Sequence, residues 1–321
     1  MTILVLLATA LLVYGLLGLA VGWAAVSQEL AAVGAPLWLL ALLVVTAGYG
    51  LLFVRWQLLL RSLGHPLAAR ASGAIFLAGL GLIAAPARSG EALRGLWLQR
   101  RHQIPLRIGV AATAAERLLD LTSALLLLAW GLGLARQRAA LALVLLALGT
   151  LAWLFSHPAA LRRLERAIGL LPLGRRWHGL QRVLREGVQA LATLRTLLLR
   201  PAPLAWGLLL TTAVWLLESS LVLHLLRQLG TAVSLEQATV LRTATSLGGV
   251  LSLLPAGLGT SEATAIGLAM LYGAGRSQAL AATLVLRLCT LALPCLLGVV
   301  ALMRQPDLSR RSQNDAPSQH S

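Results

Sequence analysis

The sequence predicts an all-α polytopic membrane protein, and three observations support this fold class. Of the 321 residues, 58% are hydrophobic and only 12% are charged, and the mean hydropathy is +0.81. Soluble domains carry about 25% charged residues, so this composition excludes an ordinary soluble domain. Long apolar segments recur along the chain, and two shorter ones are interrupted by proline and glycine. We therefore expect about six spanning helices and two broken or re-entrant helical hairpins.

Six apolar segments are long enough to cross a membrane. A hydrocarbon core about 30 Å thick requires roughly 20 residues at a helical rise of about 1.5 Å per residue. The segments that meet this length are 3–26, 35–58, 107–134, 138–156, 202–226 and 278–303. The first segment is longer than a signal peptide and has neither a basic start nor a small-residue cleavage site, so we expect a retained helix.

Two shorter apolar stretches end at a proline and continue after glycine as a second helical run. The first stretch covers about 73–86 and continues over 90–101, and the second covers about 238–254 and continues over 261–273. Membranes tolerate such breaks only where protein or a water-filled cavity satisfies the freed backbone groups. Each pair of runs therefore predicts a broken, re-entrant hairpin.

The distribution of arginine predicts the orientation. The net charge is +16, and all 27 strongly basic residues are arginine. Cytoplasmic loops of membrane proteins are enriched in such residues, which also explains the charge without nucleic acid as a partner. The arginines placed in the cytoplasm are Arg55, Arg61, Arg70, Arg100, Arg101, Arg107 and nine within 157–200. The opposite side carries Glu29, Arg136, Arg138, Arg227, Glu236 and Arg276. We expect a multi-pass protein of the cytoplasmic (inner) membrane with both termini in the cytoplasm.

The two halves of the chain resemble each other. Leu59–Gly64 and Leu225–Gly230 are similar, and each is followed by a broken hairpin, a Pro-Ala turn, a glutamate and a distant arginine. Because the arginine distribution places these halves in opposite orientations, we expect an inverted-topology repeat, which is a recurrent plan of transporters. The whole of 1–305 then forms one transmembrane domain, with repeat halves at about 35–134 and 202–303 and a disordered cytoplasmic tail over 306–321.

The Arg-rich loop 157–200 has apolar residues at helical spacing from Trp177 to Leu198, with arginines on other faces. This pattern predicts a cytoplasmic amphipathic helix on the anionic lipid surface. A specific lipid or partner site is the alternative interpretation.

Charged residues within apolar segments identify the candidate site. A charge near the bilayer centre costs at least ~2.5 to 3.5 kcal/mol, so its default interpretation is functional. The turn Pro86–Glu91 contains Arg88 and Glu91, and Arg94 follows it. The turn Pro255–Glu262 ends at Glu262, and Arg287 lies 25 residues further on. Arginines and a glycine-rich helix start suit a phosphate, whereas simple complementation of the helix dipole by the glutamates is the alternative.

The third predicted span carries Glu116, Arg117 and Asp120. The two acids are one helical turn apart, so they repel each other unless a positive group lies between them. Arg117, Arg94 or Arg287 is the expected counter-ion, and the alternatives are proton or cation coupling and catalysis. Glu218 is a further acid within an apolar segment and has no obvious partner nearby in sequence. Motifs for nucleotide, metal or serine chemistry do not occur, so we expect no catalytic residue, no metal and no cofactor.

These charged motifs, with Gly248-Gly249 before the second turn, resemble the transmembrane, flippase-like region of the lysylphosphatidylglycerol synthase family. Their order and spacing match over about 1–305. The resemblance implies a membrane module that moves or presents lipid-linked headgroups, here as a stand-alone member without the soluble aminoacyl-transferase domain.

From these observations we expect a lipid translocator for an anionic or lipid-linked phosphate headgroup. The residues expected to bind it are Arg88, Glu91, Arg94, Glu116, Arg117, Asp120, Glu262 and Arg287. One alternative is a membrane-embedded transferase on a lipid-linked substrate, with Glu116 or Asp120 as base. The other is a non-catalytic membrane partner that recruits a cytoplasmic glycosyl- or aminoacyl-transferase through 157–200.

Overall fold

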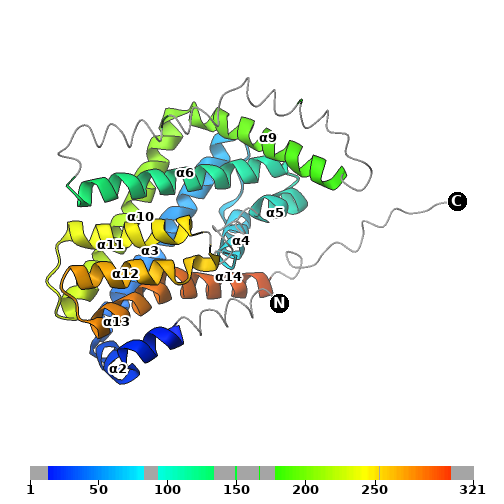
Figure 1. Ribbon diagram of the computed structural model, residues 1–321. Coiled ribbons are helices and arrows are strands. Elements are labelled where there is room, and N and C mark those ends of the chain that lie inside the picture. Colours follow the sequence, from blue (N-terminus) through cyan, green and yellow to red (C-terminus); the bar gives the residue numbers. More distant parts are fainter. Residues whose placement is uncertain are drawn as a thin grey trace.

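The computed structural model describes residues 14–82, 93–133, 149, 166, 178–252 and 254–304, and its regular elements in these ranges are all helical (Figure 1). The principal helices are α2 (Trp23–Ala32), α3 (Ala35–Ser62), α4 (Ala69–Leu80), α5 (Leu93–His102), α6 (Leu106–Gly131), α9 (His178–Leu198), α10 (Pro201–Gln228), α11 (Leu235–Leu251), α12 (Thr260–Leu271), α13 (Arg276–Arg287) and α14 (Leu293–Met303). Most of the predicted span 138–156, the turn of the first hairpin and the tail 306–321 lie outside the described residues.

Three helices within the described ranges are long and apolar enough to cross a membrane. These are α3, α10 and the continuous helix Arg276–Met303, in which a π-helical turn over Leu288–Ala292 joins α13 to α14. The helix Tyr14–Val21 and α2 count as a fourth span if they form one span, although the chain bends by 97° between them. Helix α6 has 26 residues but contains Glu116, Arg117 and Asp120. The structure therefore supports three or four of the six predicted spans.

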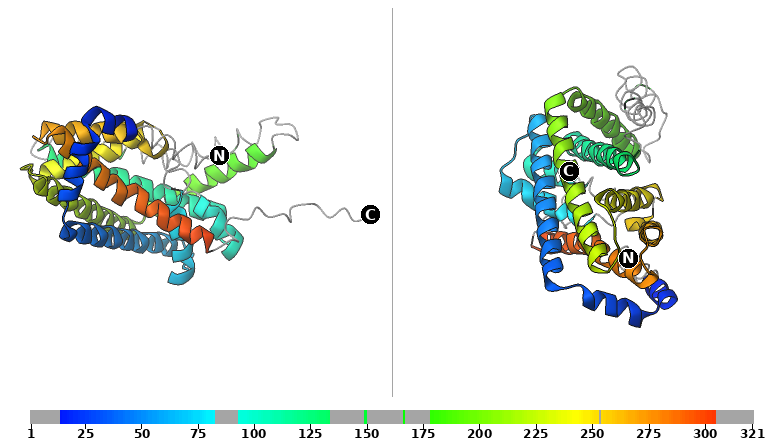
Figure 2. Two further views of the ribbon diagram at one scale, coloured as in Figure 1. Left: turned by 90° about the horizontal axis from the view of Figure 1, so that it is seen from below. Right: turned by 90° about the vertical axis from the view of Figure 1, so that its left-hand side faces the viewer.

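Five helices lie side by side in a row, in the order α9, α6, α11, α12 and α13 (Figure 1). Helices α3 and α10 cross behind this row and pack closely against each other (Figure 2). Helix α10 also contacts α6, α9, α11 and α13, so it connects most of the row. Outside the row, α2 packs against α13, and α4 packs against α14. The apolar side chains buried between these helices form the core.

Helices α3 and α10 are antiparallel, because the start of each lies beside the end of the other. The Gln228 side chain donates to the Ala32 carbonyl at 3.0 Å, and at the other end the Arg200 side chain donates to the Ser62 carbonyl. We call the second end the arginine-rich end. It also contains Arg107, and a surface pocket there is lined by Ser62, Arg107 and Arg200. Segments predicted to share a side of the membrane therefore share an end of the molecule.

The second broken hairpin consists of α11 and α12. Helix α11 starts at a capping box, in which Ser234 Oγ accepts from the Gln237 N–H and Gln237 Oε1 accepts from the Ser234 N–H. Pro255 then begins a short 3₁₀ turn, and the backbone leaves the helical region at Ala256, whose φ is 55°. Gly257 in this turn packs so closely on α11 that an added Cβ would lie 2.6 Å from the Gly249 Cα. The predicted break at Pro255 is confirmed.

The loop 157–200 contains the predicted amphipathic helix as α9. Its side chains Val188, Ala190, Leu194 and Leu197 are buried, and α9 packs against α6. The apolar face expected to lie on lipid therefore contacts protein over this stretch. Arg185 remains exposed on another face of the helix.

Candidate functional site

Glu116 and Asp120 lie one turn apart on α6 and contact arginines from three helices. Glu116 Oε2 accepts a hydrogen bond from Arg94 Nη2 of α5 at 2.7 Å, and Glu116 Oε1 lies 3.6 Å from Arg55 Nη2 of α3. Asp120 Oδ1 accepts from Arg55 Nη1 at 2.5 Å, and its Oδ2 lies 3.1 Å from Arg117 Nη1. We call these five residues the α6 cluster. The predicted placement of positive groups beside the two acids is confirmed for Arg94 and Arg117.

The position of Arg55 corrects the sequence-based prediction, which placed this residue in the cytoplasm after the second span. Helix α3 continues to Ser62, so Arg55 lies two turns inside the helix, and only 2% of its surface is exposed. Its Nη1 also donates to Thr211 Oγ1 of α10 at 2.6 Å. The sequence holds a signal for this position, because apolar residues continue on both sides of Arg55 over 51–60.

Aromatic rings hold the buried guanidinium of Arg94. Its Cζ lies 4.6 Å from the centre of the Trp56 ring and 5.6 Å from the centre of the Phe76 ring. Cation–π contacts of this kind gain strength when water is excluded. Arg94 is thus oriented by a carboxylate on one side and by aromatic rings on others.

Glu262 is completely buried, and both of its carboxylate oxygens are hydrogen-bonded. Its Oε2 accepts from the Gly259 N–H at 2.7 Å, which satisfies one free N–H at the start of α12. Its Oε1 accepts from Arg287 Nε at 2.6 Å and from the Tyr14 hydroxyl at 2.7 Å. Arg287 Nη2 also donates to the Ala256 carbonyl at 2.8 Å. Glu262 therefore caps α12 and also pairs with Arg287. Both interpretations from the sequence, complementation of the helix dipole and pairing with an arginine, describe this glutamate.

A third ion pair, which is half-buried, was not predicted. Arg242 Nη2 on α11 lies 2.6 Å from Glu218 Oε2 on α10, and the Arg242 guanidinium stacks over the Trp215 ring at 4.6 Å. Glu218 thus has a partner that sequence proximity did not reveal. Arg242 lies within the stretch 238–254, which was treated as apolar, and its charge in that stretch is the signal that could have identified it.

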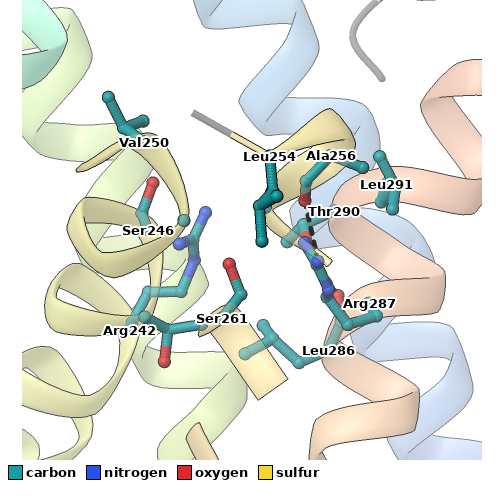
Figure 3. A pocket seen from close by; sticks show the side chains of 13 residues that line it. Arg242, Ser246, Val250, Leu254, Ala256, Ser261, Leu286, Arg287, Thr290 and Leu291 are labelled. Carbon is teal, nitrogen blue, oxygen red and sulfur yellow. Dashed lines mark hydrogen bonds between the residues drawn. The ribbon is translucent and has the colours of Figure 1, made fainter. Parts of the chain in front are cut away.

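A pocket of about 100 Å³ lies where α11 breaks and α12 begins (Figure 3). Arg242 and Arg287 approach it from opposite sides, and Ser261 lies between them (Figure 3). The remaining lining residues come from α11, the turn after it, α13 and the π-helical turn: Thr245, Ser246, Gly249, Val250, Leu254, Ala256, Gly257, Leu286, Thr290 and Leu291. The pocket thus combines two cationic groups with several hydroxyl groups.

Two buried polar atoms of residues at this pocket have no hydrogen-bond partner within the described part of the chain. They are Arg242 Nε and Thr245 Oγ1. Buried polar atoms in proteins are nearly always hydrogen-bonded, because an unpaired one keeps its full desolvation cost. Two residues that line the pocket therefore each carry an unsatisfied donor.

Six of the eight predicted binding residues are described, and they form two groups. Arg94, Glu116, Arg117 and Asp120 belong to the α6 cluster, whereas Glu262 and Arg287 are paired beside the pocket. The other two predicted residues, Arg88 and Glu91, lie outside the described residues. In the described ranges, no group of three or more His, Cys, Asp or Glu side chains is placed to hold a metal ion.

Comparison with known proteins identifies one matching family and one partial relative. The family model described as "Lysylphosphatidylglycerol synthase TM region" matches residues 3–298. A 69-residue segment, 21% of this chain, is 39% identical to glycosyltransferase AglD of Haloferax volcanii but covers only 11% of that protein. The family match and the apolar helices support a membrane location and a function connected with membrane lipids. Since the model matches nearly the whole sequence, the chain belongs to the lysylphosphatidylglycerol synthase TM region family.

Proposed function

We propose that this protein is a lipid translocator that moves a phosphate-bearing headgroup across the cytoplasmic membrane. The observation that carries the proposal is the burial of arginine–carboxylate pairs in both halves of the chain, Arg94 with Glu116 and Arg287 with Glu262. An isolated charge buried in a helix bundle is costly, and a paired arginine is neutralised until an anion competes for its donors. Guanidinium groups match phosphate oxygens in geometry and charge.

Helix capping alone explains fewer of the contacts of Glu262 and Glu116 than this proposal does. A cap explains the hydrogen bond from Gly259 to Glu262. It does not explain why the other carboxylate oxygen accepts from both Arg287 and Tyr14, or why Glu116 is buried in the middle of α6. Those contacts support a polar pathway inside the helix bundle.

We further propose that the two halves form an inverted repeat around this pathway. The packing pairs are reciprocal: α4 of the first half contacts α14 of the second, and α11 of the second half contacts α6 of the first. Within the first half α5 contacts α6, and within the second half α12 contacts α13. The antiparallel pairing of α3 and α10 also supports opposite orientations of the halves.

The proposed sidedness places the arginine-rich end in the cytoplasm, with both termini on that side of the membrane. Arg107 and Arg200 at this end, and Arg185 on α9, would then lie near anionic lipid headgroups. Membrane lipids are the principal proposed partners, and a lipid-modifying enzyme is a further proposed partner.

The match to AglD favours a second candidate function, which is a role in glycosylation of a lipid-linked substrate. In this alternative the chain is a membrane-embedded transferase or the partner of a cytoplasmic transferase that docks on 157–200. Turnover of a labelled donor by the purified protein would favour the transferase. If lipid movement persisted after deletion of 157–200, docking through that loop would not be required for movement.

Leaflet exchange in proteoliposomes tests the translocator. The purified protein is reconstituted with labelled anionic, aminoacylated and polyprenyl-phosphate lipids, and access of each label to an external quencher is followed over time. We expect exchange of at least one phosphate-bearing lipid faster than in empty vesicles. Exchange of every lipid at the rate of empty vesicles would refute the proposal.

Single carboxamide substitutions test the role of the turns. We expect Glu262→Gln and Glu91→Gln to slow exchange by about tenfold, which corresponds to about 1.4 kcal/mol, without abolishing membrane insertion. Glu236→Gln is the matched control, because Glu236 is an exposed glutamate on the same hairpin as Glu262. Unchanged exchange in both turn variants would exclude the hairpins from the mechanism.

A further inference from the structure

We propose that the pocket between Arg242 and Arg287 binds the phosphate group of a lipid headgroup, and that Arg242 leaves Glu218 to do so. This inference rests on the proposed function, in which the substrate carries a phosphate. It adds a binding residue, Arg242, and identifies the carboxylate that competes with the ligand. The pocket lies where α11 and α12 are interrupted, which gives it a wall of backbone and small side chains.

The donors around the pocket suit a tetrahedral anion. The described contacts of Arg287 use its Nε–H and one N–H of Nη2, and a guanidinium has five N–H groups. Arg242 contacts Glu218 through Nη2, while its Nε is buried without a partner. The hydroxyl group of Ser261 lies between the two arginines, and Ser246 also lines the pocket, on the side of Arg242 (Figure 3).

Thr245 is an independent indication of a ligand. The residue is 4% exposed, lines the pocket and has a buried hydroxyl without a hydrogen-bond partner in the described ranges. A phosphate oxygen is an acceptor that would satisfy this hydroxyl. The same ligand would satisfy Arg242 Nε, so one anion removes two unfavourable groups.

The rim of the pocket favours a lipid over free phosphate. Val250 and Leu254 line the pocket and are 44% and 45% exposed. Apolar side chains beside a cationic interior match a molecule whose charged headgroup is joined to acyl chains. A free phosphate ion would use only the polar part of this site.

The two arginines are held unequally, and this difference assigns their roles. Arg287 is anchored by Glu262, whose side chain is 1% exposed, and by the Ala256 carbonyl. Arg242 is held by Glu218, whose side chain is 19% exposed. Since a partly exposed carboxylate can be rehydrated at lower cost than a buried one, Arg242 is the arginine that exchanges its counter-ion. Arg287 stays in place and fixes the opposite side of the phosphate.

Binding measurements on the purified full-length protein test this site separately from transport. The two probes are a short-chain phosphatidic acid and inorganic phosphate, titrated in detergent by calorimetry. We expect the lipid probe to bind more tightly than inorganic phosphate. Arg242→Gln should weaken the lipid probe by about tenfold or more, and Thr245→Val by several-fold. Arg276→Gln, an exposed arginine on α13 that does not line the pocket, is the charge-matched control and should bind normally.

Glu218→Gln provides the decisive variant, because it should tighten binding. Removal of the competing carboxylate releases Arg242 to the phosphate, so we expect affinity to rise several-fold. A purely structural role for the pair would lower affinity or leave it unchanged. The double variant Arg242→Gln/Glu218→Gln removes the pair as a neutral unit, so it separates loss of binding from loss of folding.

The outcomes of binding and of leaflet exchange are distinct. Normal binding of the lipid probe in folded Arg242→Gln and in the double variant would overturn this inference, even if leaflet exchange continued. Tighter binding of inorganic phosphate than of the lipid would also overturn it, because the site would then accept a free anion. Binding with the expected variant pattern but without leaflet exchange would support the site and refute the translocator.

Discussion

At the scale of single residues, two arginines inside the helix bundle, one buried and one half-buried, make the same kinds of contact. Arg94 and Arg242 each contact a carboxylate, Glu116 and Glu218 respectively, and each guanidinium lies over a tryptophan ring at 4.6 Å. The carboxylate balances the charge, while the ring covers a face of the guanidinium without competing for its hydrogen bonds. These two contacts stabilise each arginine inside the bundle and fix the direction of its guanidinium N–H groups.

The Arg94–Glu116 pair should be strongly coupled. We expect Arg94→Gln or Glu116→Gln alone to lower the free energy of unfolding by about 3–5 kcal/mol, because each leaves a buried charge with reduced compensation. The double variant should recover part of this loss. Denaturant unfolding in detergent measures the three values, with exposed Arg61→Gln as control. Additive losses in the double variant would show that the two residues act independently.

The extent to which these sites could be predicted depends on sequence separation. Charges within apolar segments must find partners, so the sequence indicated that Glu116 and Glu262 would be paired. The partners Arg55 and Tyr14 are 65 and 248 residues from the acids they contact, at Asp120 and Glu262. Such contacts depend on how helices pack, which hydropathy does not encode.

At the scale of helices, hydropathy predicted some of the spans and one break, but it did not predict where a helix bends. The expected spans 35–58 and 202–226 correspond to α3 and α10, and the expected break occurs at Pro255. The first apolar segment was expected to be a spanning helix over 3–26, and its described part, from Tyr14, bends by 97° at Gly22, where φ is 96°. A glycine permits such a turn, yet an apolar sequence on both sides of it looks the same whether the helix is straight or bent.

Glycine sets the distance between α4 and α14. A Cβ added at Gly298 would lie 1.8 Å from the Gly81 nitrogen, so the two backbones touch where no side chain fits. We expect Gly298→Ala to separate these helices and to lower the free energy of unfolding by about 1–3 kcal/mol. Thermal and denaturant unfolding of the purified protein measure this change.

Gly267→Ala is the matched control for this contact. Gly267 is exposed on α12, and an added Cβ there meets nothing within 4 Å. Alanine favours the helix over glycine by about 1 kcal/mol, so this control should be neutral or stabilising. If both variants lost the same stability, the packing of α4 on α14 would not be the cause.

At the scale of the whole molecule, the two ends of the helix bundle carry different polar residues. Ser62, Arg107 and Arg200 line one surface pocket, whereas Gln228 and Gln278 donate to backbone carbonyls at the opposite end. The arginine distribution in the sequence already predicted that Arg107 and Arg200 lie on one side of the membrane and that Arg227 and Arg276 lie on the other. The structure adds that α3 and α10, which join the two ends, are antiparallel. The proposed orientation, with the arginine-rich end in the cytoplasm, rests on the distribution of charge.

Cysteine labelling in cells tests that orientation. Ala68 and Ala232 are exposed residues in the connections after α3 and α10, at opposite ends of the molecule, and each is replaced by cysteine in a Cys289→Ala/Cys295→Ala background. Because arginine-rich segments stay in the cytoplasm, a membrane-impermeant maleimide should label Ala232→Cys in intact cells and Ala68→Cys only after permeabilisation. Matching labelling kinetics after permeabilisation control for local reactivity. Labelling of both sites in intact cells would contradict the antiparallel, membrane-spanning arrangement of α3 and α10, and the reverse pattern would place the arginine-rich end outside.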